Sequence, residues 1–108
     1  MARTIEYTKQ ADTDLNGLDN SQKKQVLKAI LRVSNNPQPN TKGGHGKPLG
    51  NNLTGFLKIK LKKHGIRVFY RIVFENEIMR VVIISIRAEE QVYKLLQERI
   101  KKGQILTL

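Results

Sequence analysis

The stretch FLKIKLKKHGIRVFYR, residues 56–71, decides the fold of this chain. Its first half alternates aliphatic and basic side chains: Leu57, Lys58, Ile59, Lys60, Leu61 and Lys62. A period of two predicts a half-buried β-strand with one apolar and one charged face. Arg67 and Arg71 continue the basic face after a turn. Like charges in a row repel one another, so we expect this face to bind the phosphates of a polyanion.

The charge of the whole chain is distributed unevenly. The 108 residues carry a formal net charge of +11, yet residues 20–74 contain no Asp or Glu and hold twelve of the Lys and Arg residues. A solvated surface normally mixes both signs, so this segment indicates a nucleic acid, an acidic protein or an anionic lipid as partner. Lipid is least favoured, because the basic residues lie on an expected strand and not on an amphipathic helix.

Composition limits the class of protein. The hydrophobic fraction of 39% is sufficient for a core, and we expect residues 1–108 to form one domain. The absence of cysteine excludes disulfides, thiolate metal sites and a cysteine nucleophile. With no membrane-spanning apolar run and no signal-like N-terminus, we expect a soluble cytoplasmic protein without a membrane partner. No carboxylate pair or histidine cluster suggests a metal, and we expect no cofactor.

Periodicity predicts the element order β-α-α-β-β-β-α. A strand over residues 3–7 is followed by a short helix and by a longer one that Asp19 and Gln22 begin with a capping box. The longer helix is expected to bury Val26, Leu27, Ile30, Leu31 and Val33. Residues 37–54, rich in Gly, Pro and Asn, predict a loop, and the remaining elements are strands at 56–63, 66–74 and 78–87 and a helix at 89–101. The expected class is α+β, a small antiparallel β-sheet with two N-terminal helices packed on one face and a C-terminal helix.

Hairpin arithmetic assigns side chains to the two faces. A two-residue loop at His64-Gly65 pairs Lys58 with Arg71 and Lys62 with Arg67. A three-residue loop at residues 75–77 pairs Val68 with Ile84 and Tyr70 with Val82, whereas a two-residue loop there would bury Arg87 unpaired, at high cost. The apolar face is then expected to hold Leu57, Ile59, Leu61, Val68, Tyr70, Ile72, Val82, Ile84 and Ile86. The polar face is expected to hold Lys58, Lys60, Lys62, Arg67, Phe69, Arg71, Ser85 and Arg87.

A set of polar residues should converge on that face: Lys58, Lys60, Arg67 and Arg87, with Tyr93 on the following helix. In this spacing (Lys-x-Lys, then Arg, then Arg-x5-Tyr) the chain resembles the RelE branch of the RelE/ParE toxin superfamily, bacterial messenger-RNA endonucleases of toxin–antitoxin pairs. The resemblance covers nearly the whole chain in element order and rests in detail on residues 50–94. The loop at residues 42–52 is longer and richer in glycine than the family pattern.

The resemblance implies metal-independent cleavage of messenger RNA in the ribosomal decoding site, which inhibits translation. The RNA 2′-hydroxyl attacks the adjacent phosphate, leaving a 2′,3′-cyclic phosphate and a 5′-hydroxyl. Lys58, Lys60 and Arg67 would stabilise negative charge on the phosphoryl oxygens, because fixed cations aimed at developing charge favour the transition state. Arg87 would stabilise the leaving 5′-oxygen. Tyr93 would stack on a base or accept the proton of the 2′-hydroxyl.

The general base stays open between Tyr93 and the two lysines Lys58 and Lys60, since crowded ammonium groups lose protons more easily. Further contacts to messenger or ribosomal RNA are expected from Lys42, Lys47, Lys62, Phe69 and Arg71. Each residue also has a plainer interpretation: Arg67 and Arg87 could pair with Glu75 or Glu89, and Tyr93 could cap the core. His45 and His64 stand beside glycines, which favours turn residues over catalytic ones.

Three other functions remain open: a non-catalytic RNA-binding domain, a ParE-like gyrase poison on the same fold, and a RelE-type protein without activity. The ParE branch lacks the paired lysines and the tyrosine, which argues against it here. A toxin also needs an antitoxin. We expect an acidic cognate antitoxin to wrap the basic face and to cover or displace the last helix through an apolar stripe, Val92, Leu95, Leu96 and Ile100.

Overall fold

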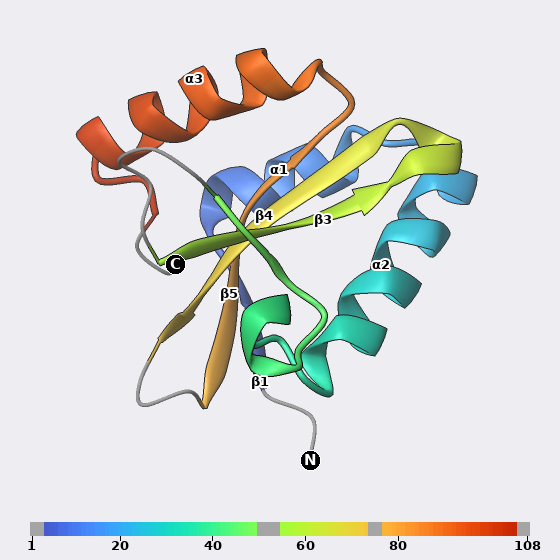
Figure 1. Cartoon of the computed structure of the whole chain (residues 1–108). Coiled ribbons are helices and arrows are strands. Elements are labelled where there is room, and N and C mark those ends of the chain that lie inside the picture. Colours follow the sequence, from blue (N-terminus) through green and yellow to red (C-terminus); the bar gives the residue numbers. More distant parts are fainter. Residues whose placement is uncertain (1–3, 50–54, 74–76, 106–108) are drawn as a thin grey trace.

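The computed structural model describes residues 4–49, 55–73 and 77–105 (Figure 1). The helices and strands are β1 (Thr4–Tyr7), α1 (Lys9–Asn16), α2 (Asn20–Ser34), the 3₁₀ helix η1 (Asn40–Lys42), β2 (Lys47–Pro48), β3 (Phe56–Leu61), the 3₁₀ helix η2 (Lys62–His64), β4 (Ile66–Val73), β5 (Ile78–Ser85) and α3 (Glu89–Lys101). The five strands form one sheet in the order β1-β5-β4-β3-β2. The predicted α+β class is confirmed, the predicted element order is confirmed apart from the additional short strand β2, and α3 has the predicted bounds.

The sheet is mixed, and the prediction of a wholly antiparallel sheet was wrong at one edge. β1 runs parallel to β5, with Thr4 opposite Ile78. Between β1 and β5 the chain forms α1, α2 and the strands β2, β3 and β4, and such a long connection permits parallel pairing. At the other edge, β2 lies within the segment predicted as loop and pairs Lys47 with Lys58. Pro48 is tolerated there because an edge strand leaves backbone groups unpaired. Residues 50–54 of that predicted loop lie outside the described residues.

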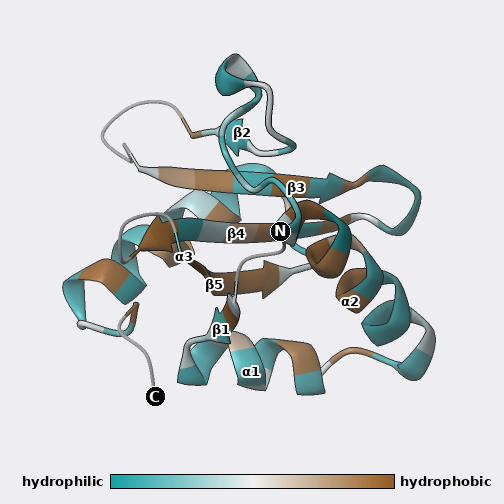
Figure 2. Ribbon diagram, turned by 90° about the horizontal axis from the view of Figure 1, so that it is seen from below, coloured by the Kyte–Doolittle hydropathy of each residue, from teal (hydrophilic) through white to brown (hydrophobic). Residues whose placement is uncertain are grey.

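Helices cover both faces of the sheet, as Figures 1 and 2 show, with α1 and α2 on one side and α3 on the other. The first core cluster packs sheet residues against α1 and α2 and contains Ala11, Val26, Ile30, Val33, Leu57, Ile59, Ile66, Val68, Tyr70, Met79, Val81 and Ile84. The second packs under α3 and contains Leu49, Phe56, Phe69, Val82, Ile83, Val92 and Leu96. α3 therefore covers part of the face that was predicted to be polar.

A β-bulge in the β4–β5 ladder changes the predicted faces. Val68 lies opposite Ile84 as predicted, but the register shifts after Phe69, so that Tyr70 pairs with Val81 and Val82 is the extra residue. A bulge places two neighbouring residues against one partner, and Val82 accordingly joins the cluster under α3. Ile86, predicted on the apolar face, follows the end of β5 and is 61% exposed. Residues 75 and 76 of the predicted three-residue loop lie outside the described residues.

The β3–β4 hairpin has a longer turn than predicted. Its connection is η2 followed by Gly65, whose φ of 64° is left-handed and therefore suits glycine. Lys58 consequently pairs with Phe69 and Lys60 with Arg67. The predicted pairs Lys58–Arg71 and Lys62–Arg67 were therefore wrong. The register differs by two residues, however, and a shift of two preserves the face to which each side chain points.

The start of α2 follows the predicted capping box. The Asp19 carboxylate accepts a hydrogen bond from the Gln22 backbone N–H, and the Gln22 side chain accepts one from the Asp19 N–H. The helix buries Val26, Ile30 and Val33 as predicted. Leu27 and Leu31 are exposed by 44% and 61%, contrary to the prediction, because the buried stripe of this helix is narrower than its run of aliphatic residues.

Tyr70 holds the glycine-rich segment against the sheet. Its hydroxyl donates a hydrogen bond of 2.7 Å to the Pro37 carbonyl, and burial raises the pKa of Tyr70, so the donor proton stays in place. Gly46 passes so close that a Cβ there would lie 2.2 Å from the Tyr70 hydroxyl and 2.7 Å from Leu57 Cδ2. Only a residue without a side chain fits at this position.

We therefore expect Gly46→Ala to reduce the free energy of unfolding by about 1–3 kcal/mol, the usual cost of overpacking. Gly17→Ala is the matched control, since its Cβ would meet its nearest neighbour, the Asp14 carbonyl oxygen, at an ordinary 3.5 Å. Urea denaturation of the two variants measures the difference. Equal stabilities would show that the contact with Tyr70 relaxes without cost.

Candidate anion-binding site

Two adjacent strands place three cations side by side on the sheet face that α3 covers. Lys58 and Lys60 are two residues apart on β3 and therefore share a face, and Arg67 on β4 lies directly opposite Lys60. Directly opposed residues of an antiparallel pair share a face. We call Lys58, Lys60 and Arg67 the cation cluster. The first turn of α3 passes over it, so that Glu89 and, one turn later, Tyr93 lie against the cluster.

A single carboxylate oxygen lies at the centre of the cation cluster. Oε1 of Glu89 is 2.6 Å from Nζ of Lys58 and 3.3 Å from Nζ of Lys60. The same oxygen is 4.0 Å from Nε of Arg67. The Lys58 side chain is 12% exposed and the Glu89 side chain 31%, so the group lies at the boundary between core and solvent. Charged nitrogens of three residues thus lie within 4.0 Å of one anionic oxygen.

The ion pairs stabilise the charged form of both Lys58 and Glu89. The hydrogen bond from Lys58 is the main cause that lowers the pKa of Glu89, and a second one from Lys60 adds to it. Burial alone would lower the pKa of Lys58, but its hydrogen bonds to Glu89 and Tyr93 outweigh this and raise it. The raised pKa favours the charged form of Lys58 and weighs against Lys58 as the base, one of the alternatives that the sequence leaves open.

Tyr93 belongs both to the core and to the site. Its hydroxyl accepts a hydrogen bond of 3.2 Å from Lys58 Nζ, and the ammonium lies 5.6 Å from the centre of its ring. The ring also makes an apolar contact with the buried Phe69, since the two ring centres are 5.5 Å apart. The ring is half-buried. The contact with Lys58 fits the catalytic interpretation of Tyr93, and the contact with Phe69 fits the core-capping one.

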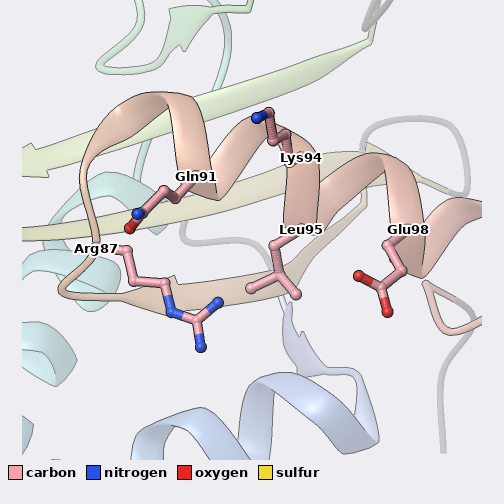
Figure 3. A pocket seen from close by; sticks show the side chains of 5 residues that line it. All are labelled: Arg87, Gln91, Lys94, Leu95 and Glu98. Carbon is pink, nitrogen blue, oxygen red and sulfur yellow. The ribbon is translucent and has the colours of Figure 1, made fainter.

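Arg87 reaches the cation cluster through its backbone and not through its guanidinium. The Arg87 carbonyl accepts a hydrogen bond of 3.0 Å from Nη1 of Arg67. Its side chain instead lines a groove of about 310 Å³ beside α3, together with Gln91, Lys94, Leu95 and Glu98 (Figure 3). The predicted convergence of the guanidinium was therefore wrong for this structure. Arg87 follows the end of β5, where strand alternation no longer determines the direction of a side chain.

A family model described as the ParE toxin of the type II toxin–antitoxin system parDE matches residues 5–93, which include the whole cation cluster and Tyr93. The chain belongs to the ParE toxin family. This confirms membership of the RelE/ParE superfamily, which the sequence resembles. No curated protein sequence matches the chain.

Solved structures similar to this ParE-family chain share its fold. A double mutant of the E. coli toxin RelE in the free state has a TM-score of 0.74 and 24% identity, covering 93% of this chain and 99% of that one. The toxin–antitoxin complex RelBE2 from Mycobacterium tuberculosis gives 0.68 and 24%, covering 81% and 100%. The intact E. coli RelBE complex gives 0.63 and 23%, covering 82% and 99%.

The five further RNA contacts expected from the sequence occupy different positions in the ParE-family fold. Lys47 is exposed and directly opposite Lys58, so it extends the cation cluster along the same face. Lys62 and Lys42 are exposed on the two 3₁₀ helices. Arg71 lies over the Phe56 ring at 5.1 Å. Phe69 is fully buried under α3, so the expectation of an exposed ring on the polar face was wrong.

The remaining candidates add no second site. His45 and His64 are exposed next to turn glycines, as predicted. Within residues 4–49, 55–73 and 77–105 no three His, Asp or Glu side chains gather as a metal site. No helix of the described residues is long and apolar enough to cross a bilayer.

Glu89 is the site residue that sequence reasoning missed. From the sequence it was only a possible partner of Arg67 or Arg87. The available signal was its place at the first position of a helix that also carries Tyr93, one turn further on the same side. An acid in the first turn is ordinary for a helix, because it faces the positive end of the dipole, and this hid its second role.

Proposed function

We propose that this ParE-family protein is a ribosome-dependent endoribonuclease toxin that cleaves messenger RNA in the decoding site. The observation that carries the proposal is the convergence of Lys58, Lys60 and Arg67 on one anionic oxygen. A phosphoryl oxygen of RNA carries the same charge and accepts the same hydrogen bonds. The cation cluster is thus suited to a phosphodiester without a metal ion.

The proposed reaction follows from that charge arrangement. The 2′-hydroxyl loses its proton to a base, its oxygen bonds to phosphorus, and the bond from phosphorus to the 5′-oxygen breaks. The leaving 5′-oxygen takes up a proton, so the products are a 2′,3′-cyclic phosphate and a 5′-hydroxyl. Negative charge grows on the phosphoryl oxygens, and the cation cluster stabilises it more in the transition state than in the ground state.

We assign the proton-transfer roles from the contacts around Lys58. The raised pKa of Lys58 disfavours it as the base and suits it as a charged hydrogen-bond donor. Tyr93, hydrogen-bonded to Lys58, and Lys60 remain the proposed acceptors of the 2′-hydroxyl proton. Arg87 remains a proposed donor to the leaving oxygen, for which its exposed side chain would turn from the groove beside α3 toward the cluster.

The proposed partners are messenger and ribosomal RNA in the cytoplasm and an acidic antitoxin. Val92 and Leu96, which the sequence suggested as antitoxin contacts, are fully buried in the core. The exposed Leu27 and Leu31 lie on α2, a helix with basic but no acidic residues, and offer an apolar contact for an acidic chain. We expect the antitoxin to neutralise the toxin. A purified toxin–antitoxin complex that cleaved messenger RNA as fast as the free protein would contradict this expectation.

A second candidate function is poisoning of DNA gyrase, because the family model that matches residues 5–93 is that of the ParE toxin. In that case the basic face would contact gyrase or its DNA, and the cation cluster would have no reaction to catalyse.

One experiment separates the candidates. The protein is added to bacterial ribosomes programmed with a defined message, to the same RNA free in solution, and to gyrase with supercoiled plasmid. We expect cleavage, mapped by primer extension, only on the ribosome, with 2′,3′-cyclic phosphate ends. Trapped gyrase–DNA cleavage without RNA cleavage would replace the proposal with the second candidate. Activity in none of the three would leave an RNA-binding or inactive protein.

A further inference from the structure

The carboxylate of Glu89 occupies the position on the cation cluster that a phosphate would need. Oε1 lies within 4.0 Å of charged nitrogens of Lys58, Lys60 and Arg67. Any phosphate oxygen bound by the same three groups would lie in contact with this carboxylate. Two anions so close repel each other strongly, so both cannot stay there.

Helix stability alone does not account for these contacts. An acid in the first turn stabilises a helix from an exposed position, as the neighbouring Glu90 can. Glu89 instead turns back over the sheet and neutralises side chains that would otherwise repel one another. In the free protein it keeps the ammonium groups of Lys58 and Lys60 together around one point.

The site still attracts an anion while Glu89 is in place. The cluster carries three positive charges and the carboxylate only one negative charge, and the exposed Lys47 adds a further positive charge beside Lys58. The Nε–H of Arg67 is buried and has no hydrogen-bond acceptor among the described residues. A phosphate oxygen that replaced the carboxylate could accept this bond. The Glu89 side chain is 31% exposed, so solvent is open to it once it leaves the cluster.

We propose that Glu89 is a built-in competitor of the RNA phosphate, which holds the cation cluster assembled in the free protein and is displaced when RNA binds. This inference rests on the proposed function, because it concerns the same cluster and the same ligand class. It assigns Glu89 two opposite effects: it stabilises the folded protein and weakens the binding of a phosphodiester. A residue with a purely structural role would not weaken binding.

The test uses a short 2′-O-methyl oligouridylate, which carries RNA phosphates but cannot be cleaved. Fluorescence anisotropy measures its affinity for the wild-type protein and for Glu89→Gln, which keeps the shape and removes the charge. We expect the variant to bind about tenfold more tightly, as the loss of one competing charged hydrogen bond implies, and to melt at a lower temperature. Glu90→Gln, with the same change in net charge, should bind nearly as the wild type does.

A second variant of Glu89 separates the effect of its position on the cation cluster from effects of net charge or of folding. Glu89→Asp keeps the charge in the first turn of α3 but shortens the side chain by one methylene group, so its affinity should lie between those of the wild type and Glu89→Gln. Equal affinities of Glu89→Gln and Glu90→Gln, or no binding by any variant, would overturn the inference. If Glu89→Gln binds more tightly but wild-type protein does not cleave messages on ribosomes, the competitor stands and the nuclease proposal fails.

Discussion

Lys58→Ala is expected to slow messenger-RNA cleavage on the ribosome by about 10²–10³-fold, the loss seen when one donor to a developing negative charge is removed. Lys58 has the most buried side chain of the cation cluster, 12% exposed against 29% for Lys60 and 27% for Arg67. Its bonds to Glu89 and Tyr93 fix its position before RNA binds. A fixed and poorly hydrated ammonium stabilises a transition state more than a mobile one, because little reorganisation is needed.

The matched control for this prediction is Lys63→Ala. Lys63 is exposed on η2, outside the cation cluster, and its replacement changes the net charge by the same amount. Single-turnover cleavage of a message on the ribosome, followed by primer extension, gives the rate for each variant. A folded Lys58→Ala protein that cleaved within threefold of the wild-type rate would remove Lys58 from the proposed mechanism.

Asp14→Ala is expected to lower the free energy of unfolding by about 3–5 kcal/mol, the typical cost of removing one partner of a buried ion pair. The Asp14 carboxylate accepts two hydrogen bonds from the Arg99 guanidinium, of 2.8 and 2.9 Å. It also accepts the backbone N–H of Ile84 on β5. The Arg99 side chain is 9% exposed, so its charge would remain buried without a counter-ion.

This pair matters for the site because it joins α1 to α3, the helix that carries Glu89 and Tyr93. Thermal unfolding followed by circular dichroism measures the loss. In the double variant Asp14→Ala/Arg99→Leu we expect part of the stability to return, since no unpaired charge remains. The surface pair of Glu98 with Lys102, exposed by 57% and 56%, is the control, and Glu98→Gln should leave the melting temperature nearly unchanged. An Asp14→Ala protein as stable as Glu98→Gln would refute the prediction.

Sequence reasoning succeeded where the responsible residues are neighbours in the chain. The capping box of Asp19 and Gln22, the bounds of α3 and the alternation of Lys58 and Lys60 depend on contacts within a few residues. It failed where a turn or a bulge intervened. The longer turn that ends at Gly65 and the extra residue Val82 shift the strand pairings, whereas the prediction assumed short loops and regular strands. Both errors changed which residues lie opposite each other, but only the bulge placed a side chain, that of Val82, on the other face of the sheet.

The sequence by itself determined the α+β class, the helices and every strand except β2, and the gathering of Lys58, Lys60 and Arg67 on one face, because period and charge are local properties. Only the tertiary structure decided that α3 lies over that face. This placement buries Phe69 and brings Glu89 to Lys58, 31 residues away. Likewise it joins Asp14 to Arg99 across 85 residues. Such contacts depend on which apolar surfaces of sheet and helix fit together, and this packing leaves no periodic signal in the chain.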